Sequence, residues 1–351
     1  TGLVFYDASG AMIAEHDFVE DPLWDVQTLQ SVASERGFIL HRGQRFKGEC
    51  TSGCSRSVLQ YFAPDGRQRA TSYVSLNTTA DERVTVGTSG ALTLLLVVST
   101  AKNPKDARAY LANEEGLVEG PLSFPQWWDW YPKIEWDGSA FVIADRSYAS
   151  PYALWIRRIG VAPFAVREPQ NLGVVPFFDI AAHDGRLFLV LYAEDAAIRG
   201  MFVPESGAPD EGFLLSQSAA PQELLGVSDG PAVDLALWRE NGRSEHSQRI
   251  VATRIDRAGR PLDGGGLHVA DELARAGPAH AAATSFGSTF LIAWTADEAL
   301  HTRVLSDTGE FVAGSQTVAP AAPKHEGTVA IVRAGPHAIV LWNALVDDKP
   351  S

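Results

Sequence analysis

A unit of about 50 residues repeats along the whole chain, and this repeat limits the possible folds more than any other feature. The best-formed copy runs from His280 to Ala319 and holds four short apolar runs, which we label A to D in chain order. Runs A and B meet at a Gly turn, and runs C and D meet at an Asp-Thr-Gly turn. This pattern is typical of two consecutive β-hairpins in each unit.

Glycines mark the two turns in successive units. The A–B turn recurs at Gly37, Gly90, Gly138, Gly185, Gly230, Gly287 and Gly335, with spacings of 53, 48, 47, 45, 57 and 48 residues. The C–D turn recurs at Gly10, Gly66, Gly116, Gly207, Gly259 and Gly309, and the copy near Gly160 is degenerate. Tight hairpins favour glycine because it adopts positive φ without steric cost.

Seven such units predict an all-β fold, a seven-bladed β-propeller with four-stranded antiparallel blades. The chain starts with a C–D hairpin and ends after an A–B hairpin, and neither hairpin can bury its faces alone. We therefore expect the N-terminal C–D hairpin and the C-terminal A–B hairpin to form one blade and close the ring. The expected single domain covers 1–351, with blades at about 28–76, 77–124, 125–172, 173–218, 219–272, 273–320, and 321–351 plus 1–27.

The B strands are nearly continuous apolar runs, as expected for strands covered on both faces by neighbouring blades. Near the end of run B, an aromatic residue stands seven or eight positions after the turn glycine at Trp238, Trp294 and Trp342, and Tyr192 occupies the same place. Recurrence in several blades indicates packing between blades more than ligand contact.

The charge balance excludes some classes of partner. The chain has 29 Lys+Arg and 43 Asp+Glu, a net charge of −14, which argues against nucleic-acid binding and against adhesion to an anionic membrane surface. No apolar run is long enough to predict a transmembrane segment, and the opening TGLVFYD reads as a strand and not as a signal peptide.

The two cysteines, Cys50 and Cys54, are separated by three residues. The simplest interpretation is a small loop disulfide, which would place the protein in an oxidising compartment. Two free thiols, or a redox or metal role, remain as alternatives. The loop is too short for such a bond to stabilise the whole fold strongly.

The repeat resembles those of secreted bacterial propeller proteins, including propeller lipoproteins. The resemblance is carried by GSTFLIAW with VLSDTGE, by GPAVDLALW with RIDRAGRPL, and by GPHAIVLW with FYDASGAM. It covers the whole chain as a blade pattern, and it implies a fold and an exported location (periplasm, cell surface or extracellular space) without implying an activity. The repeat signatures of sialidases and of intracellular scaffolding propellers are missing, so their functions do not transfer.

The loops after runs B and D lie on one face of a propeller, and three unusual features fall on that face. They are an aromatic segment between blades two and three, a tryptophan before blade one, and a basic segment around the cysteines. At the aromatic position of blade three an acidic residue stands instead, next to an arginine. The resulting candidate ligand-binding residues are Trp24, Arg42, Arg45, Trp127, Trp128, Trp130, Tyr131, Asp145 and Arg146. The alternative is a Trp plug under a long loop, with solvated basic residues around it.

From this face the sequence predicts an exported, non-enzymatic propeller that binds a protein or a glycan. One alternative is a propeller-type hydrolase or lyase with its active site at the mouth of the channel, and another is a structural module of a surface assembly. We expect no cofactor and no catalytic residue from the motifs, although a Ca²⁺ or Mg²⁺ ion in the channel cannot be read from sequence. Other domains or a lipid anchor are left open as further parts of such a protein.

Overall fold

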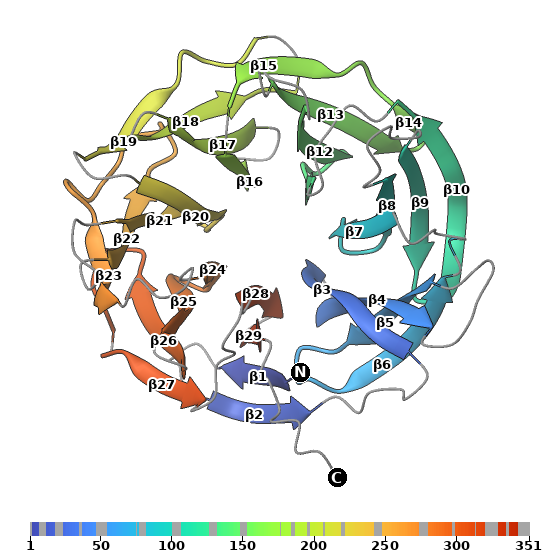
Figure 1. The fold of residues 1–351 in the computed structure, drawn as a ribbon, viewed down its shortest axis with the longest axis horizontal. Helices are drawn as coiled ribbons and strands as arrows, with labels where there is room; N and C mark the ends of the chain where they lie inside the picture. The colour runs from blue at the N-terminus through green and yellow to red at the C-terminus, as the bar shows by residue number, and fades with distance from the viewer. Residues whose placement is uncertain are drawn as a thin grey trace. The chain divides into compact units, whose positions relative to one another are not determined.

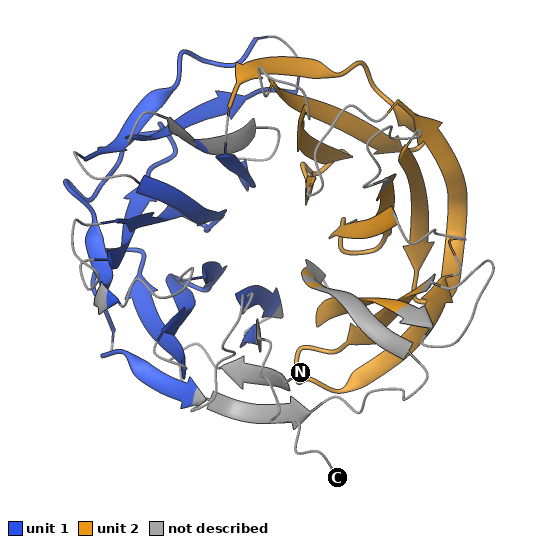
Figure 2. Ribbon diagram, in the orientation of Figure 1, with its two compact units in different colours: residues 1–18, 177–183, 189–351 blue, residues 19–176, 184–188 orange. Residues whose placement is uncertain are grey.

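The computed structural model describes residues 2–6, 12–17, 24–34, 37–46, 55–74, 76, 82–99, 107–125, 132–147, 153–175, 177–183, 187–194, 197–205, 208–218, 222–241, 248–273, 280–296, 299–312, 314–319, 329–334 and 337–342. The regular elements of these residues are 29 β-strands (Figure 1). The chain divides into two compact units, which we describe separately (Figure 2).

Unit 2 spans Val19–Pro176 and Asp184–Phe188 and contains three complete sheets. The first holds β3 (Trp24–Ser34), β4 (Gly37–Phe46), β5 (Ser55–Phe62) and β6 (Gln68–Val74). The second holds β7 (Glu82–Thr88), β8 (Thr93–Ser99), β9 (Ala107–Asn113) and β10 (Gly116–Phe124). The third holds β11 (Lys133–Trp136), β12 (Ala140–Arg146), β13 (Ala153–Val161), β14 (Phe164–Val166) and β15 (Gln170–Val174), and both of its last strands pair with β13.

Unit 1 spans Thr1–Phe18, Phe177–His183 and Leu189–Ser351 and contains four sheets. Three sheets follow chain order. The first holds β16 (Phe177–His183), β17 (Leu187–Glu194, of which Leu187 and Phe188 are assigned to unit 2), β18 (Ala197–Val203) and β19 (Phe213–Gln217). The second holds β20 (Gln222–Ser228), β21 (Asp234–Glu240), β22 (Gln248–Ile255) and β23 (Leu267–Leu273), and the third holds β24 (Ala281–Phe286), β25 (Thr289–Ala296), β26 (Ala299–Ser306) and β27 (Gln316–Ala319). In the fourth sheet, β1 (Gly2–Tyr6) and β2 (Met12–Asp17) join β28 (Val329–Ala334) and β29 (His337–Trp342) in the order β2-β1-β29-β28. Strands from the two ends of the chain thus pair directly, with Leu3 opposite Leu341.

The C–D turns of three sheets share one hydrogen-bond pattern. The amides of Gly66, Gly259 and Gly309 each donate to the carbonyl three residues earlier. Their φ angles of 82°, 79° and 93° lie in the left-handed region, where a side chain is strained. The predicted turn glycines at these positions are therefore confirmed.

Two of these glycines also bring their turn against the preceding sheet. A Cβ atom on Gly309 would lie 2.6 Å from Nη2 of Arg254, and one on Gly259 would lie 2.7 Å from Cε2 of Phe202. Arg254 belongs to β22 and Phe202 to β18, the third strand of the preceding sheet in each case. The repeat glycine thus serves the contact between neighbouring sheets as well as the turn itself.

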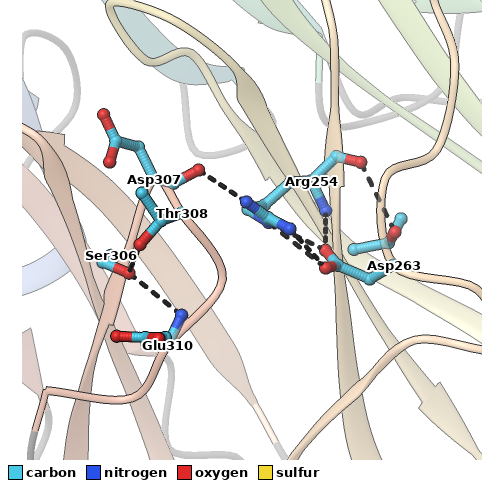
Figure 3. Close-up of polar contacts among 7 residues, drawn as sticks. Arg254, Asp263, Ser306, Asp307, Thr308 and Glu310 are labelled. Carbon is cyan, nitrogen blue, oxygen red and sulfur yellow. Dashed lines mark hydrogen bonds and ion pairs between the residues drawn. The ribbon is translucent and has the colours of Figure 1, made fainter.

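Arg254 forms a polar link between two sheets of unit 1 (Figure 3). Its guanidinium donates to the Asp263 carboxylate at 2.7 Å from Nη2 and at 3.0 Å from Nε. Its Nη1 donates across the sheet interface to the carbonyl of Asp307 at 2.6 Å. Because Asp263 is itself largely buried, the bidentate pair satisfies a carboxylate that water reaches poorly.

The second strands form the core, as predicted. Every residue of β21 is buried, and so is the run from Ala140 to Asp145 in β12. Trp238 and Trp294 are 0% and 3% exposed within apolar clusters, which confirms that these two recurring tryptophans are packing residues.

One turn prediction needs correction and one is confirmed. The turn near Gly160 is degenerate, as predicted, because β13 continues to Val161 and the chain reverses at Ala162–Pro163. Gly230 does not have positive φ and is needed for space, because a Cβ there would collide with the carbonyl of Val233.

Candidate functional site

The predicted aromatic and cysteine segments fall outside the part of the chain that the structure describes. These residues are Trp127, Trp128, Trp130, Tyr131, Cys50 and Cys54. Trp24 and Arg45 lie on adjacent strands at one end of their sheet, where Trp24 is opposite Phe46 and Arg45 is opposite Asp25. Their ligand-binding role stays a prediction.

Arg42 and Arg56, from the predicted basic segment, lie within their own sheet. Arg56 donates from Nε to Oε1 of Gln44 at 2.7 Å, and its guanidinium lies 5.2 Å from the centre of the exposed Tyr73 ring. Arg42, in the middle of β4, is half-buried between Leu29 and Val58 of the flanking strands.

A buried acidic residue, Asp145, is the most unusual predicted site residue. It lies near the end of β12, opposite Trp155 of β13, while Ile143 is opposite Arg157. Side chains two residues apart on a strand share a face, so Asp145 and Arg157 are diagonal neighbours on one face of the sheet. Hairpin register therefore brings together two charged residues that are twelve positions apart in sequence.

The surroundings of this pair are apolar. Asp145 and Arg157 are 1% and 2% exposed, and the same face carries Phe141 and Ile143, which pack against the sheet of β7–β10. Neither carboxylate oxygen of Asp145 has a hydrogen-bond partner among the described residues.

Arg157 reaches toward the end of the neighbouring sheet. Its guanidinium lies 5.0 Å from the centre of the Phe124 ring, and its Nη1 donates to the carbonyl of Pro125 at 3.1 Å. The arginine thus contacts the point where the chain leaves β10.

Burial controls the ionisation of the pair. Desolvation raises the pKa of Asp145 to about 8, against the opposing attraction of Arg157. Desolvation also lowers the pKa of Arg157, against the opposing effect of Asp145. Asp145 is therefore mainly a neutral carboxylic acid at pH 7, a form that can donate a proton or a hydrogen bond.

A second acidic residue in the same sheet shows how a structural carboxylate differs. Asp137, in the β11–β12 turn, accepts hydrogen bonds from the amide of Ala140 at 2.7 Å and from the amide and hydroxyl of Ser139 at 2.8 Å. Its other oxygen accepts from Nε of Arg158 at 3.3 Å. Both oxygens of Asp137 thus accept hydrogen bonds, and the side chain fixes the turn. The oxygens of Asp145, in contrast, accept none within the described part of the chain.

A buried histidine and serine also lie together, in the first sheet. His41 Nε2 is 3.1 Å from Oγ of Ser57, and burial lowers the pKa of His41 to about 4. His41 and Ser57 lie on the adjacent strands β4 and β5, and both are 2% exposed or less. We interpret this pair as a polar bridge within the sheet.

Sequence reasoning selected Asp145 because it interrupts the aromatic pattern, but it missed Arg157. The segment LWIRRIG contains two adjacent arginines in an otherwise apolar strand, and this signal could have predicted a buried charge partner. Arg146 is half-buried at the end of β12. Among the described residues there is no cluster of three or more His, Cys, Asp or Glu suited to a metal ion, and no helix long and apolar enough to cross a membrane.

The fold is similar to that of known propellers. The β-propeller domain of the Trilobed protease from Pyrococcus furiosus matches with a TM-score of 0.53 and 9% identity, over 88% of this chain and 89% of that one. Pyrococcus horikoshii acylaminoacyl peptidase matches with a TM-score of 0.54 and 9% identity, over 88% of this chain and 49% of that one, so this chain spans about half its length. Kuenenia stuttgartiensis hydrazine synthase matches with a TM-score of 0.57 and 12% identity, over 95% and 99% of the two chains.

No protein-family profile and no curated sequence matches the chain. At these identities the similar structures establish an all-β propeller fold with antiparallel sheets. The predicted kinship with bacterial propeller lipoproteins is not shown by any of them.

The main functional prediction, a non-enzymatic propeller that binds a protein or glycan, is wrong by this comparison. The similar propellers include those of two peptidases, the Trilobed protease and acylaminoacyl peptidase.

Proposed function

We propose that this chain is a propeller-type hydrolase that cleaves amide bonds. The observation that carries the proposal is Asp145, a buried carboxyl group whose pKa of about 8 keeps it protonated at neutral pH beside a guanidinium. Strongly perturbed ionisable groups cluster at functional sites, and the propellers of the two peptidases support the same class of reaction.

The two side chains suit different parts of amide hydrolysis. The Asp145 acid can protonate the leaving amine while a water molecule attacks the carbonyl carbon, and the water's proton then returns to the carboxylate. The Arg157 guanidinium can stabilise the negative charge that develops on the carbonyl oxygen. Proton transfer is efficient when the pKa of the acid lies near the working pH, as it does here.

The test is a hydrolysis assay with free and N-acylated peptides, in which mass spectrometry detects the new amine. We expect cleavage by the wild-type chain and a loss of about 100-fold or more in Asp145→Asn. Asp65→Asn is the matched control and should retain full activity. Asp65 lies in an exposed turn, and asparagine keeps the side-chain oxygen that accepts from the amide of Arg67. Failure of the wild-type chain to cleave any peptide would exclude the proposal, and an unchanged rate in Asp145→Asn would remove Asp145 from it.

We also propose that the seven sheets are the seven blades of one closed propeller and therefore one domain. Support comes from the shared strand order of the sheets and from the pairing of β1 with β29. A closed ring should unfold in one calorimetric transition. Two separated transitions, one for each compact unit, would contradict it.

We propose that the protein is exported from the cytoplasm, because the expected Cys50–Cys54 disulfide needs an oxidising compartment. Intact mass should rise by the mass of two hydrogens after reduction of the protein purified from an oxidising compartment. An unchanged mass would argue for free thiols.

A further inference from the structure

A cavity of about 320 Å³ opens in unit 1 between the outermost strand β23 of one sheet and strands β25 and β26 of the next. Its lining combines an indole, an imidazole, a guanidinium, a carboxylate, a hydroxyl and aliphatic groups, and the residues that matter most are Trp294, His301, Arg303, Asp271, Ser315 and Leu273. This volume is at the small end of ligand sites, which suits one small molecule.

The floor of the cavity is held firmly by ring stacking and hydrogen bonds. The Trp294 ring stacks on the His301 imidazole with a centroid distance of 5.5 Å and an angle of 17°. His301 is fixed in turn by the carbonyl of Ala296 at 3.3 Å and by the hydroxyl of Thr317 at 3.4 Å. Because Trp294 is 3% exposed and stacked by His301, a ligand would meet the preformed surface of the His301 imidazole.

The guanidinium of Arg303 is fixed at one side. Its Nη1 donates to the carbonyls of His268 at 3.1 Å and Val269 at 2.9 Å, and its Cζ lies 3.5 Å from the centre of the Phe311 ring. These contacts use part of its hydrogen-bonding capacity, because a guanidinium carries five N–H donors. Its Nε makes no hydrogen bond within the described part of the chain.

The carboxylate of Asp271 is held by a chain of polar contacts. Its Oδ1 is 3.1 Å from Nδ1 of His268, and Nε2 of that histidine is 3.1 Å from Nη1 of Arg249. Since arginine can only donate, Nε2 must accept, and His268 then carries its proton on Nδ1 and donates it to Asp271. More than half of the Asp271 side chain remains exposed.

The two opposite charges of the cavity do not neutralise one another by contact. Arg303 is engaged with backbone carbonyls and an aromatic ring, and Asp271 is paired with His268, while the two form no direct ion pair. A small ligand with separated charges of opposite sign is the chemical complement of such a site.

We propose that this cavity binds a free amino acid with an apolar side chain. The α-carboxylate of the ligand pairs with Arg303, its α-ammonium group pairs with Asp271, and its side chain lies against Ala270, Ala296 and the His301 imidazole. The site is in unit 1 and involves none of the residues assigned to amide hydrolysis. The binding proposal is therefore tested independently of that function.

Calorimetric titration with L-leucine and its blocked forms tests the charge pattern. We expect L-leucine to bind with a Kd of about 1 mM or tighter. N-acetyl-leucine lacks the ammonium charge and leucinamide lacks the carboxylate, so each should bind at least about tenfold more weakly. Equal affinity for all three ligands, or no binding of leucine, would overturn the proposal.

Variants locate the site. Asp271→Asn and Arg303→Met should each weaken leucine binding by about tenfold or more. The controls Glu310→Gln and Arg260→Met make the same charge changes at exposed turn positions of the two sheets and should bind normally. Arg303 also packs on Phe311, so Arg303→Met changes packing as well as charge. Arg303→Lys, which keeps the charge, and a melting curve of each variant are therefore measured beside it. Normal leucine binding by a folded Asp271→Asn variant would exclude this cavity.

Discussion

Replacing Asp145 by Asn should remove a large pH dependence from the stability of the protein. Burial raises the pKa of Asp145 from its ordinary value of 3.8 to about 8 in the folded state. The folded protein therefore holds a proton that the unfolded chain releases, and the free energy of unfolding falls as pH rises through this window. Below pH 4 both states are protonated and the effect vanishes.

The size of the effect follows from linkage. Each pH unit between the two pKa values costs about 1.4 kcal/mol, which amounts to at most about 4 kcal/mol at pH 7 and about 5 kcal/mol at pH 8. Asn has nearly the shape of the protonated acid and never ionises. Asp145→Asn should thus match the wild type near pH 4 and become progressively more stable than it toward pH 8.

Urea unfolding at several pH values between 4 and 8 measures this difference directly, with Asp65→Asn as a control at an exposed position. The opposite reasoning is that Asp145 is ionised and paired with Arg157. Removing one partner of a buried ion pair costs about 3–5 kcal/mol, so Asp145→Asn would then be less stable than the wild type at pH 8. That result, or parallel pH curves for the two proteins, would refute a protonated Asp145.

Three further substitutions test the contacts between sheets in unit 1 by thermal or urea unfolding. Gly309→Ala should lower the free energy of unfolding by more than Gly287→Ala does. Both glycines have positive φ, but only at Gly309 would the added Cβ meet Arg254. Equal decreases would show that only the backbone conformation matters. Arg254→Leu should cost about 3–5 kcal/mol by leaving Asp263 buried without its partner, and Asp263→Asn in the same background should recover part of that loss. Trp238→Phe should lower the free energy of unfolding by about 1–3 kcal/mol, since it removes the indole N–H that donates to Glu240 at 3.3 Å and leaves a void. A decrease below about 0.5 kcal/mol would count against tight packing at this position.

The sequence predicts the hairpins well because each is encoded locally. At Gly66, Gly259 and Gly309 the turn needs positive φ, and glycine is the residue that supplies it at low cost. The third sheet of unit 2 breaks the pattern, because β13 runs through Gly160 and pairs with two short strands. The sequence shows only a degenerate copy of the turn there, and the chain reverses at Ala162–Pro163.

The candidate sites are less predictable because they depend on contacts between strands and sheets. The cavity uses Asp271 from one sheet and Trp294 and Arg303 from the next, and nothing in the sequence sets the distance between them. Asp145 could be selected from sequence, whereas its burial and its position beside Arg157 depend on hairpin register and on the apolar face of the preceding sheet.

One position of the repeat connects packing with chemistry. Trp294 and Asp145 both stand seven residues after their turn glycine, and each is buried near the end of the second strand of its sheet. Trp294 fills that position with a large apolar ring, as a fold under selection for stability alone would favour. Asp145 forgoes this apolar burial and adds the cost of keeping a carboxyl group away from water. Where a repeat departs from its own packing rule at a cost of several kcal/mol, a functional requirement is the simplest physical explanation. Asp145→Asn tests this reasoning, because the variant should gain stability and lose hydrolysis together.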